Sequence, residues 1–213
     1  MASLFKWGRK EETPAVKAVS VSASDAVSPS KVLPRVLAAL KHIPSPVLLD
    51  LGPVIGSNVS FFGDELACKI KVEDLFAEVE AHTRQGTRAQ LPQALPARLR
   101  HAPESIDGIL CWDLFDYLDK PSAQALAVHL VSLLKPGGVL YGFFGASAVD
   151  LTHYTRFIVE NPSTFRLRLA PATPTKRYVL VVRDLNRLFE GLLTSESVLL
   201  KSSVRETLFR KRA

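Results

Sequence analysis

The sequence predicts an α/β protein whose sheet is mostly parallel and ends in an antiparallel hairpin. Three observations support this fold class: short apolar runs alternate with amphipathic segments, a glycine-bearing loop follows an early apolar run, and two extended runs near the C-terminus are separated by only two serines. Strands that alternate with helices form parallel sheets, whereas closely spaced runs pair as hairpins. A chain of 213 residues is long enough for one such domain with a well-packed core.

The expected strands are short, and most of them are continuously apolar, which suits strands that helices cover on both faces. In chain order they are Val47–Leu51, Ala67–Val72, Ile106–Trp112, Val139–Phe144, Ser197–Lys201 and Val204–Phe209. The last two form the predicted hairpin. Arg166–Leu169 and Tyr178–Val181 are two further extended segments. Residues 82–105 are polar and interrupted by prolines, and no clear strand appears among them.

Helices are expected where apolar residues recur at a spacing of three or four. Leu126, Leu130 and Leu134 show this spacing in one of them. In chain order the expected helices are 31–42, Ser57–Leu66, Leu75–Ala81, 90–100, Ser122–Leu134, Asp150–Glu160 and Leu185–Gly191. The segment Lys135–Gly138 should stop the helix before it, because lysine and glycine favour helix C-termini. The helix at 150–160 would lie over the mouth of a pocket.

The first 30 residues are predicted to be a disordered tail that precedes a domain of residues 31–213. They contain few large apolar residues after the first seven and are rich in Ser, Ala, Val and charged residues. The net charge of +6 lies at the two ends, because residues 1–46 and 201–213 carry +4 each and the middle carries −2. A nucleic-acid interface needs a continuous basic face, so nucleic acid is not an expected partner.

Cysteine usage and hydropathy indicate a cytoplasmic protein. Cys68 and Cys111 lie in apolar stretches, which favours buried, reduced thiols. No CxxC pair or cluster of Cys and His is present, so no metal site is expected. No apolar run approaches the ~20 residues of a membrane span, and the N-terminus lacks the long apolar segment of a signal peptide.

The stretch Asp50–Asn58 carries most of the functional information. It follows an apolar run, and the acidic pair Glu73–Asp74 begins 23 residues after Asp50. A strand, a glycine-bearing turn, a helix and an acid at the end of the next strand frame a nucleotide-type pocket. A carboxylate before the first glycine would repel a pyrophosphate but attract ammonium and sulfonium charges. This arrangement favours S-adenosylmethionine over NAD.

With these features the chain resembles the class I S-adenosylmethionine-dependent methyltransferases over roughly residues 45–210. The family's loop pattern is acid-x-Gly-x-Gly-x-Gly. Asp50, Gly52 and Gly56 match it, whereas Val54 replaces the middle glycine. Leu134–Gly138 matches the family's Leu-Lys-Pro-Gly-Gly. The resemblance implies a Rossmann-like, doubly wound sheet with a C-terminal antiparallel hairpin, S-adenosylmethionine as cofactor, and methyl transfer to an unassigned acceptor, with a small molecule favoured.

The resemblance also implies which residues would bind the cofactor. Gly52 would let the backbone approach the ligand, and Gly56 would open a helix whose amides accept a carboxylate. Asp50 would lie near the methionine ammonium, while Glu73, or else Asp74, would accept the ribose hydroxyls. The expected cofactor-binding residues are Asp50, Gly52, Pro53, Gly56, Asn58, Glu73, Asp74, Trp112 and Asp113. No catalytic residue is assigned, because positioning alone supplies much of the rate of such a displacement.

Other interpretations of these residues stay open. Val54 narrows the loop and Pro53 stiffens it, so the pocket could be degenerate and the chain a non-catalytic binding or scaffold protein. A methyltransferase acting on a macromolecule, steered by the basic ends, is another alternative. Trp112 could be a core aromatic, Asp113 a cap of the next turn and Glu73 a solvated charge. An NAD-dependent oxidoreductase is disfavoured, because the G-x-G-x-x-G spacing is absent.

Overall fold

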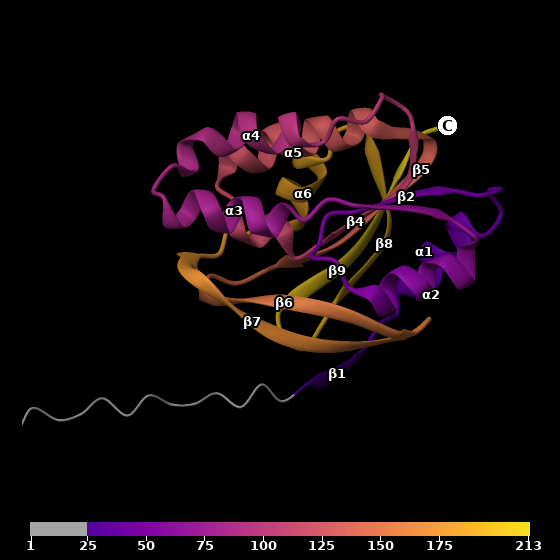
Figure 1. Ribbon diagram of the computed structural model, residues 1–213, viewed down its shortest axis with the longest axis horizontal. Helices are drawn as coiled ribbons and strands as arrows, with labels where there is room; N and C mark the ends of the chain where they lie inside the picture. Colours follow the sequence, from indigo (N-terminus) through magenta and orange to yellow (C-terminus); the bar gives the residue numbers. More distant parts are fainter. Residues whose placement is uncertain (1–24) are drawn as a thin grey trace, which may run out of the picture.

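The computed structural model describes residues 25–213, and a six-stranded sheet forms its centre (Figure 1). The strands are β2 Val47–Asp50, β3 Lys69–Val72, β4 Ile106–Trp112, β5 Leu134–Gly145, β8 Leu192–Leu199 and β9 Val204–Lys211. Their order is β3-β2-β4-β5-β9-β8. Strands β2 to β5 are parallel, and β9 is antiparallel to both of its neighbours, β5 and β8. The predicted fold class, a mostly parallel sheet with a C-terminal antiparallel hairpin, is confirmed.

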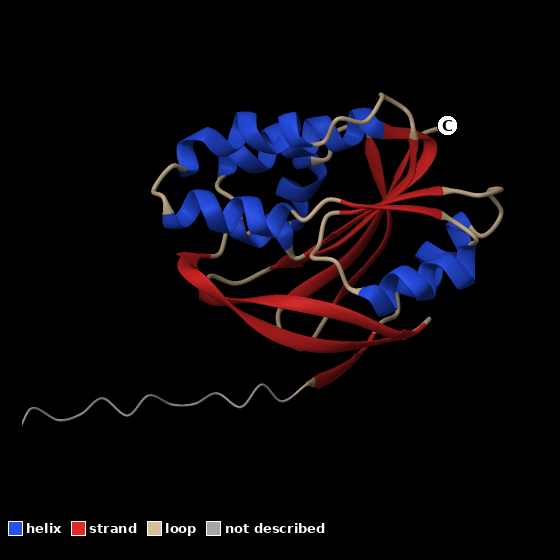
Figure 2. Ribbon diagram, viewed as in Figure 1, coloured by secondary structure: helices blue, strands red, loops and turns tan. Residues whose placement is uncertain are grey.

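Helices cover both faces of this sheet, as its apolar strands require (Figure 2). All seven residues of β4 are buried. The helices are α1 Leu33–Leu40, α2 Gly56–Leu66, α3 Leu75–Arg84, α4 Leu91–Arg98, α5 Lys120–Leu133 and α6 Val182–Leu188, with short 3-10 helices η1 Arg88–Gln90 and η2 Leu114–Tyr117. The first two lie on one side of the sheet, and α4, α5 and α6 lie on the other (Figures 1 and 2). Six of the seven helices expected from the sequence are present.

A second, antiparallel sheet corrects two expectations. It contains β1 Ala26–Pro29, β6 Asp150–Asn161 and β7 Thr164–Lys176, in the order β1-β7-β6. The helix expected at Asp150–Glu160 is wrong, because this segment is rich in β-branched and aromatic residues and pairs along its length with β7. Residues 26–29 form a strand although they fall in the expected tail. The rest of that tail, residues 1–24, lies outside the described residues.

Smaller differences concern the ends of elements. The helix before Lys135–Gly138 ends at Leu133, as expected, but these four residues belong to the strand β5, with Gly137 at φ +78°. Lys135 instead pairs with Asp107, its Nζ lying 2.8 Å from Oδ2. The end of α5 is capped by Lys211 of β9, whose Nζ donates to the carbonyl of Leu134 at 2.7 Å. Residues 178–181, expected to be extended, belong to no strand.

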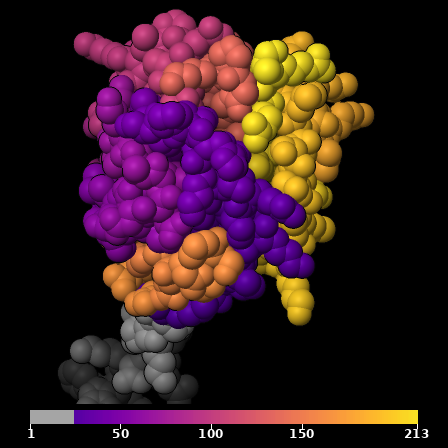
Figure 3. Space-filling model, turned by 90° about the vertical axis from the view of Figure 1, so that its right-hand side faces the viewer, coloured from indigo at the N-terminus to yellow at the C-terminus, as the bar shows by residue number. Residues whose placement is uncertain are grey.

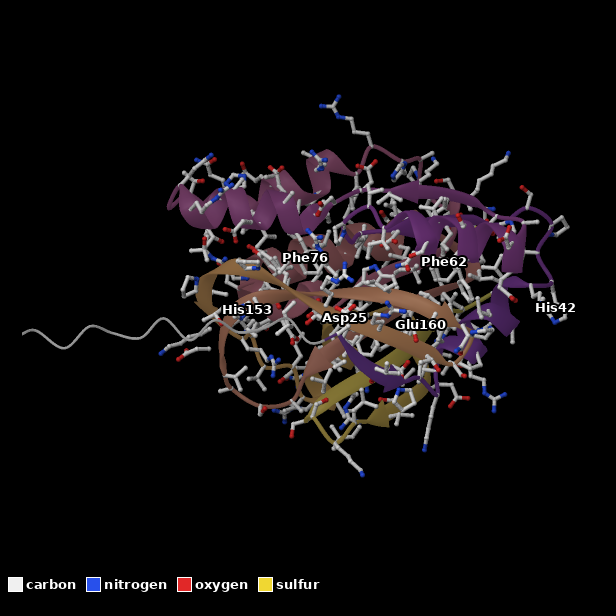
Figure 4. All side chains as sticks on the ribbon, turned by 60° about the horizontal axis from the view of Figure 1, so that its bottom comes forward. Asp25, His42, Phe62, Phe76, His153 and Glu160 are labelled. Atoms are coloured by element: carbon white, nitrogen blue, oxygen red, sulfur yellow. The ribbon has the colours of Figure 1, made fainter. Side chains whose placement is uncertain are left out.

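The β6–β7 hairpin lies across the carboxyl ends of the parallel strands (Figure 1). Part of the hairpin forms the orange surface at the lower end of the molecule (Figure 3). Tyr117, just after β4, donates its hydroxyl to the carbonyl of His153 in β6 at 2.7 Å. Glu80 of α3 accepts from the Tyr154 hydroxyl at 2.9 Å and from the Thr173 hydroxyl at 2.7 Å. His153 and Glu160 lie toward opposite ends of β6, with Phe76 of α3 and Phe62 of α2 behind them (Figure 4). The hairpin therefore covers the edge of the sheet at which ligands of such sheets bind.

None of the helices in residues 25–213 combines the length and apolarity that a membrane crossing requires. Within the same residues, Cys68 and Cys111 are free thiols, and no group of His, Cys, Asp and Glu side chains is placed to hold a metal ion.

Candidate functional site

Asp50 and Trp112 meet at the tips of the neighbouring strands β2 and β4. The Asp50 side chain is buried, and its Oδ1 accepts from the backbone N–H of Gly52 at 2.9 Å and from the indole Nε1–H of Trp112 at 2.6 Å. Burial raises the pKa of Asp50 to about 6, although both hydrogen bonds favour the ionised form. The carboxylate expected beside a ligand's ammonium is thus satisfied by the chain's own donors.

The indole of Trp112 lies directly against Gly52. A Cβ added to Gly52 would come within 2.6 Å of Trp112 Cδ1, so only glycine leaves room for the ring. Trp112 itself has φ +50°, a left-handed conformation that is uncommon for a bulky residue and costs about 1–3 kcal/mol. In this structure an aromatic side chain makes the close approach to Gly52.

Three phenyl rings, none of them among the expected site residues, complete the filling of the space around Trp112. Phe157 of β6 stacks on the indole at a centroid distance of 5.4 Å, and Phe143 of β5 stacks on Phe157 at 4.5 Å. Phe165 of β7 meets the Trp112 ring edge-on at 6.0 Å. All four side chains are buried. The hairpin thus contributes two of the rings that occupy the cleft.

Asn58, in the first turn of α2, fastens the hairpin. Its side chain is buried, the Nδ2 group donates to the carbonyl of Phe157, and Oδ1 accepts from the backbone N–H of Val159, both at 2.8 Å. β6 is an outer strand of its sheet, so the amide pairs main-chain groups that no neighbouring strand pairs. Gly56 begins α2, and a Cβ there would meet nothing within 4 Å.

The acidic pair after β3 is divided between two environments. Glu73 Oε1 lies 3.7 Å from Nε2 of His101. Asp74 caps α3 by accepting from the backbone N–H of Ala77 at 3.0 Å, and it lines a cavity of about 210 Å³ together with Pro53 and Arg156. Ligand pockets of drug-sized molecules usually measure about 300–1,000 Å³. Of the two acids, Asp74 is the one that faces the remaining cavity.

Asp113 belongs to a second polar cluster beyond the end of β4. It is 8% exposed, and its Oδ1 has no hydrogen-bond partner among the described residues. Burial, and then the neighbouring carboxylate of Asp116, raise the pKa of Asp113 to about 8. Asp116 accepts from the backbone N–H of Gly145 at 2.8 Å and lies 2.9 Å from Nε of Arg177. Burial raises the pKa of Asp116 to about 6.

The structure thus divides the expected residues among several places. Asp50, Gly52 and Trp112 share one buried contact, and Pro53 and Asp74 line one cavity. The remaining four lie elsewhere: Gly56, Asn58, Glu73 and Asp113. Sequence reasoning missed the phenyl rings of the hairpin. Apolar and polar residues do not alternate in their strand, and the signal that favoured a strand was the enrichment of residues 151–159 in β-branched and aromatic residues.

Comparison with known proteins identifies the fold. No protein-family model matches the chain, and no curated protein matches it in sequence. Among solved structures, a putative S-adenosylmethionine-dependent methyltransferase from Listeria monocytogenes superimposes with a TM-score of 0.52 at 9% identity, covering 84% of this chain and 96% of that one. One from Mesorhizobium loti gives 0.51 at 12% identity, with the same coverages.

A third solved structure, the PH0226 protein of Pyrococcus horikoshii OT3, gives a TM-score of 0.51 at 10% identity, covering 82% of this chain and 86% of that one. The chain therefore has the fold of the class I S-adenosylmethionine-dependent methyltransferases, as the sequence motifs predicted. The names of the first two structures give S-adenosylmethionine as the cofactor of those proteins.

In this structure aromatic side chains occupy the space beside Gly52 and Asp50, where the resemblance places the methionine end of S-adenosylmethionine. The indole of Trp112 covers Gly52, and it also occupies the Asp50 carboxylate. Phe157 closes the space above the ring. The part of the cleft beside Pro53 and Asp74 is hollow. Binding of the whole cofactor would require the indole to leave its place.

We expect Gly52→Ala to destabilise the fold by about 1–3 kcal/mol, because the new methyl group overlaps the indole. Denaturant unfolding measures the loss. The fluorescence of Trp112, in a Trp7→Phe background, reports the displaced ring. Gly63→Ala is the matched control, since a Cβ there meets nothing within 4 Å and alanine favours a helix. Unchanged stability and fluorescence of Gly52→Ala would contradict this packing.

Asn58→Ala should loosen the hairpin, because it leaves the carbonyl of Phe157 and the N–H of Val159 buried without a hydrogen-bond partner. Each unpaired group costs about 1–3 kcal/mol, so we expect a loss of at least about 2 kcal/mol and faster hydrogen exchange at Val159. Ser57→Ala, on the exposed side of the same turn, serves as control. Equal exchange rates in the two variants would show that the hairpin is held by other contacts.

Asp113 should make the folded state less stable as pH rises. Its raised pKa means that the folded protein keeps a proton that the unfolded chain has already released between pH ~4 and ~8. Asp113→Asn lacks this proton linkage, so its unfolding free energy relative to wild type should increase by about 2 kcal/mol from pH 6 to pH 8. Thermal or denaturant unfolding at both pH values checks this. A pH-independent difference would disprove the raised pKa.

Proposed function

We propose that this chain is a non-catalytic binding protein built on the methyltransferase fold. The observation that carries the proposal is the contact of Trp112 with Gly52 and Asp50, which places an aromatic ring of the protein where the cofactor's methionine end would lie. Methyl transfer requires the donor's sulfonium and the acceptor to meet on one axis. A cleft filled by buried rings provides no such axis.

The attachments of the hairpin support the same conclusion. A lid that opens for each turnover needs few contacts, whereas this hairpin is fastened by Asn58, Glu80 and Tyr117 and contributes Phe157 to the core. Removal of the hairpin from the cleft would expose buried rings and leave several hydrogen-bonding groups without partners. The closed arrangement is therefore the stable one for this chain.

S-adenosylmethionine-dependent methyl transfer to a small molecule is the second candidate. Specific observations favour it: the fold itself, the carboxylate of Asp50 at the tip of β2, and the carboxylate of Asp74 beside the remaining cavity. In that case Asp50 and Asp74 would hold the two ends of the cofactor after Trp112 had left. The residues of this chain would position and desolvate the acceptor, while the cofactor would supply the methyl group.

Calorimetric titration with S-adenosylmethionine and with S-adenosylhomocysteine decides between the two candidates. The binding-protein proposal expects no micromolar binding of either compound to wild-type protein. If the chain catalyses methyl transfer, both compounds should bind. Asp50→Ala and Asp74→Ala should then each weaken binding at least tenfold, or by about 1.4 kcal/mol. Glu160→Gln on β6, outside the lining of the cavity, is the charge-matched control. Micromolar binding that depends on Asp50 would overturn the proposal.

A further inference from the structure

A small cavity beside Asp113 lies between the two sheets. Its volume is about 100 Å³, which corresponds to roughly three water molecules at about 30 Å³ each. Three phenyl rings form part of its wall: Phe143, Phe157 and Phe165. Ser28 of β1 and the turn between β8 and β9 line its outer side. The cavity is distinct from the hollow beside Pro53 and Asp74, although Thr155 lines both.

The chemistry of this cavity is set by one unpaired carboxyl group. Asp113 is its only charged lining residue, and Oδ1 of that side chain has no partner among the described residues although it is buried. Thr155, also in the lining, lies near the Asp113 side chain and favours its ionised form. A buried carboxyl oxygen without a donor costs about 1–3 kcal/mol or more, so a ligand that supplies the missing partner would bind favourably.

The two charged groups around Asp113 balance each other. The charged groups that act on Asp113 are Asp116, just after β4, and Arg177, which follows β7. Arg177 is paired with Asp116, its Nε lying 2.9 Å from Oδ2. Because Asp116 and Arg177 neutralise each other, an ionised Asp113 is the carboxylate of this cluster that lacks a counter-cation among the described residues. An anion would be repelled at this position.

The residues that line the cavity favour an organic cation over a metal ion. A hard metal ion such as Ca²⁺ needs six to eight oxygen ligands, whereas this cavity offers one carboxyl group, three hydroxyl groups and mostly apolar side chains. Phenyl rings attract organic ammonium groups through cation–π interactions and tolerate their alkyl substituents. A tetramethylammonium-sized group has five non-hydrogen atoms and matches the volume.

We propose that the cavity beside Asp113 binds a small organic cation, an alkylated ammonium group held by the Asp113 carboxylate among the three phenyl rings. The inference names the ligand class of the proposed binding function and rests on it. Because Asp113 must be ionised to hold the cation, and its pKa is raised to about 8, binding should tighten as pH rises from 6 toward 8. Asp116 and Arg177 are the charged neighbours that contribute to this dependence.

The test compares tetramethylammonium with its neutral isostere 2,2-dimethylpropane or, for solubility, tert-butanol, by NMR titration of the full-length chain. We expect saturable shifts at Gly142, Phe143 and Phe165 with the ammonium and at least tenfold weaker binding of the neutral compound. Asp113→Asn should weaken ammonium binding at least tenfold. Asp64→Asn, an exposed carboxylate of α2, should leave it unchanged. Unfolding curves confirm that both variants are folded.

Three results would overturn the inference: no saturable binding of the ammonium, equal binding of the neutral compound, or unchanged binding in Asp113→Asn. These outcomes are distinguishable from failure of the proposed function. Failure of that function appears as binding of S-adenosylmethionine that Asp50→Ala weakens, whereas the cation site is identified by its dependence on Asp113.

Discussion

The hydrogen bond from the indole of Trp112 to the carboxylate of Asp50 is the interaction on which the rest of the site depends. A buried carboxylate is costly unless donors satisfy it, and here the donors are one indole N–H and the backbone N–H of Gly52. The same indole fills the space above Gly52, which no other residue type would allow. The left-handed backbone of Trp112 shows that this position costs free energy and is held by its surroundings.

Those surroundings come largely from the hairpin. Phe157 covers the outer face of the indole, and Asn58 holds the backbone on both sides of Ile158 in place. An outer strand exposes N–H and C=O groups that invite pairing with another chain, and the Asn58 amide satisfies two of them from the side of α2. The hairpin therefore protects its own edge by the same contact that closes the cleft. Closure and edge protection depend on one side chain.

The central sheet could be predicted from the sequence because its signals are local. The apolar runs at Val47 and Ile106 and the loop with Gly52 and Gly56 fixed the order of strands and helices, and the paired runs around Ser202 fixed the antiparallel end. The hairpin at 150–176 could not be assigned with the same rules. Its first strand mixes polar and apolar residues in a pattern that also suits a helix, and only pairing with β7 decides between them.

The filling of the cleft was beyond sequence reasoning for a different reason. Trp112 and Phe157 are 45 residues apart, and their contact depends on where the hairpin folds back, which no local pattern encodes. The sequence left open whether Trp112 is a core aromatic or a ligand platform, and the structure places it in the core. It also left open which acid of the pair after β3 faces the cleft, and there the direction of the Asp74 side chain depends on its capping of α3.

Although aromatic rings fill the cleft, several buried carboxyl groups remain near the tips of the parallel strands. Asp50, Asp113 and Asp116 are all buried near the strand tips, with Arg177 as the cation paired within this cluster. Asparagine at these positions would avoid the cost of burying charge, so for stability alone the carboxyl groups are a poor choice. Residues that break a local stability rule without structural compensation mark functional positions. Asp50 is compensated by Trp112 and Asp116 by Arg177, which leaves Asp113 as the buried carboxyl group with an oxygen that no donor within residues 25–213 satisfies.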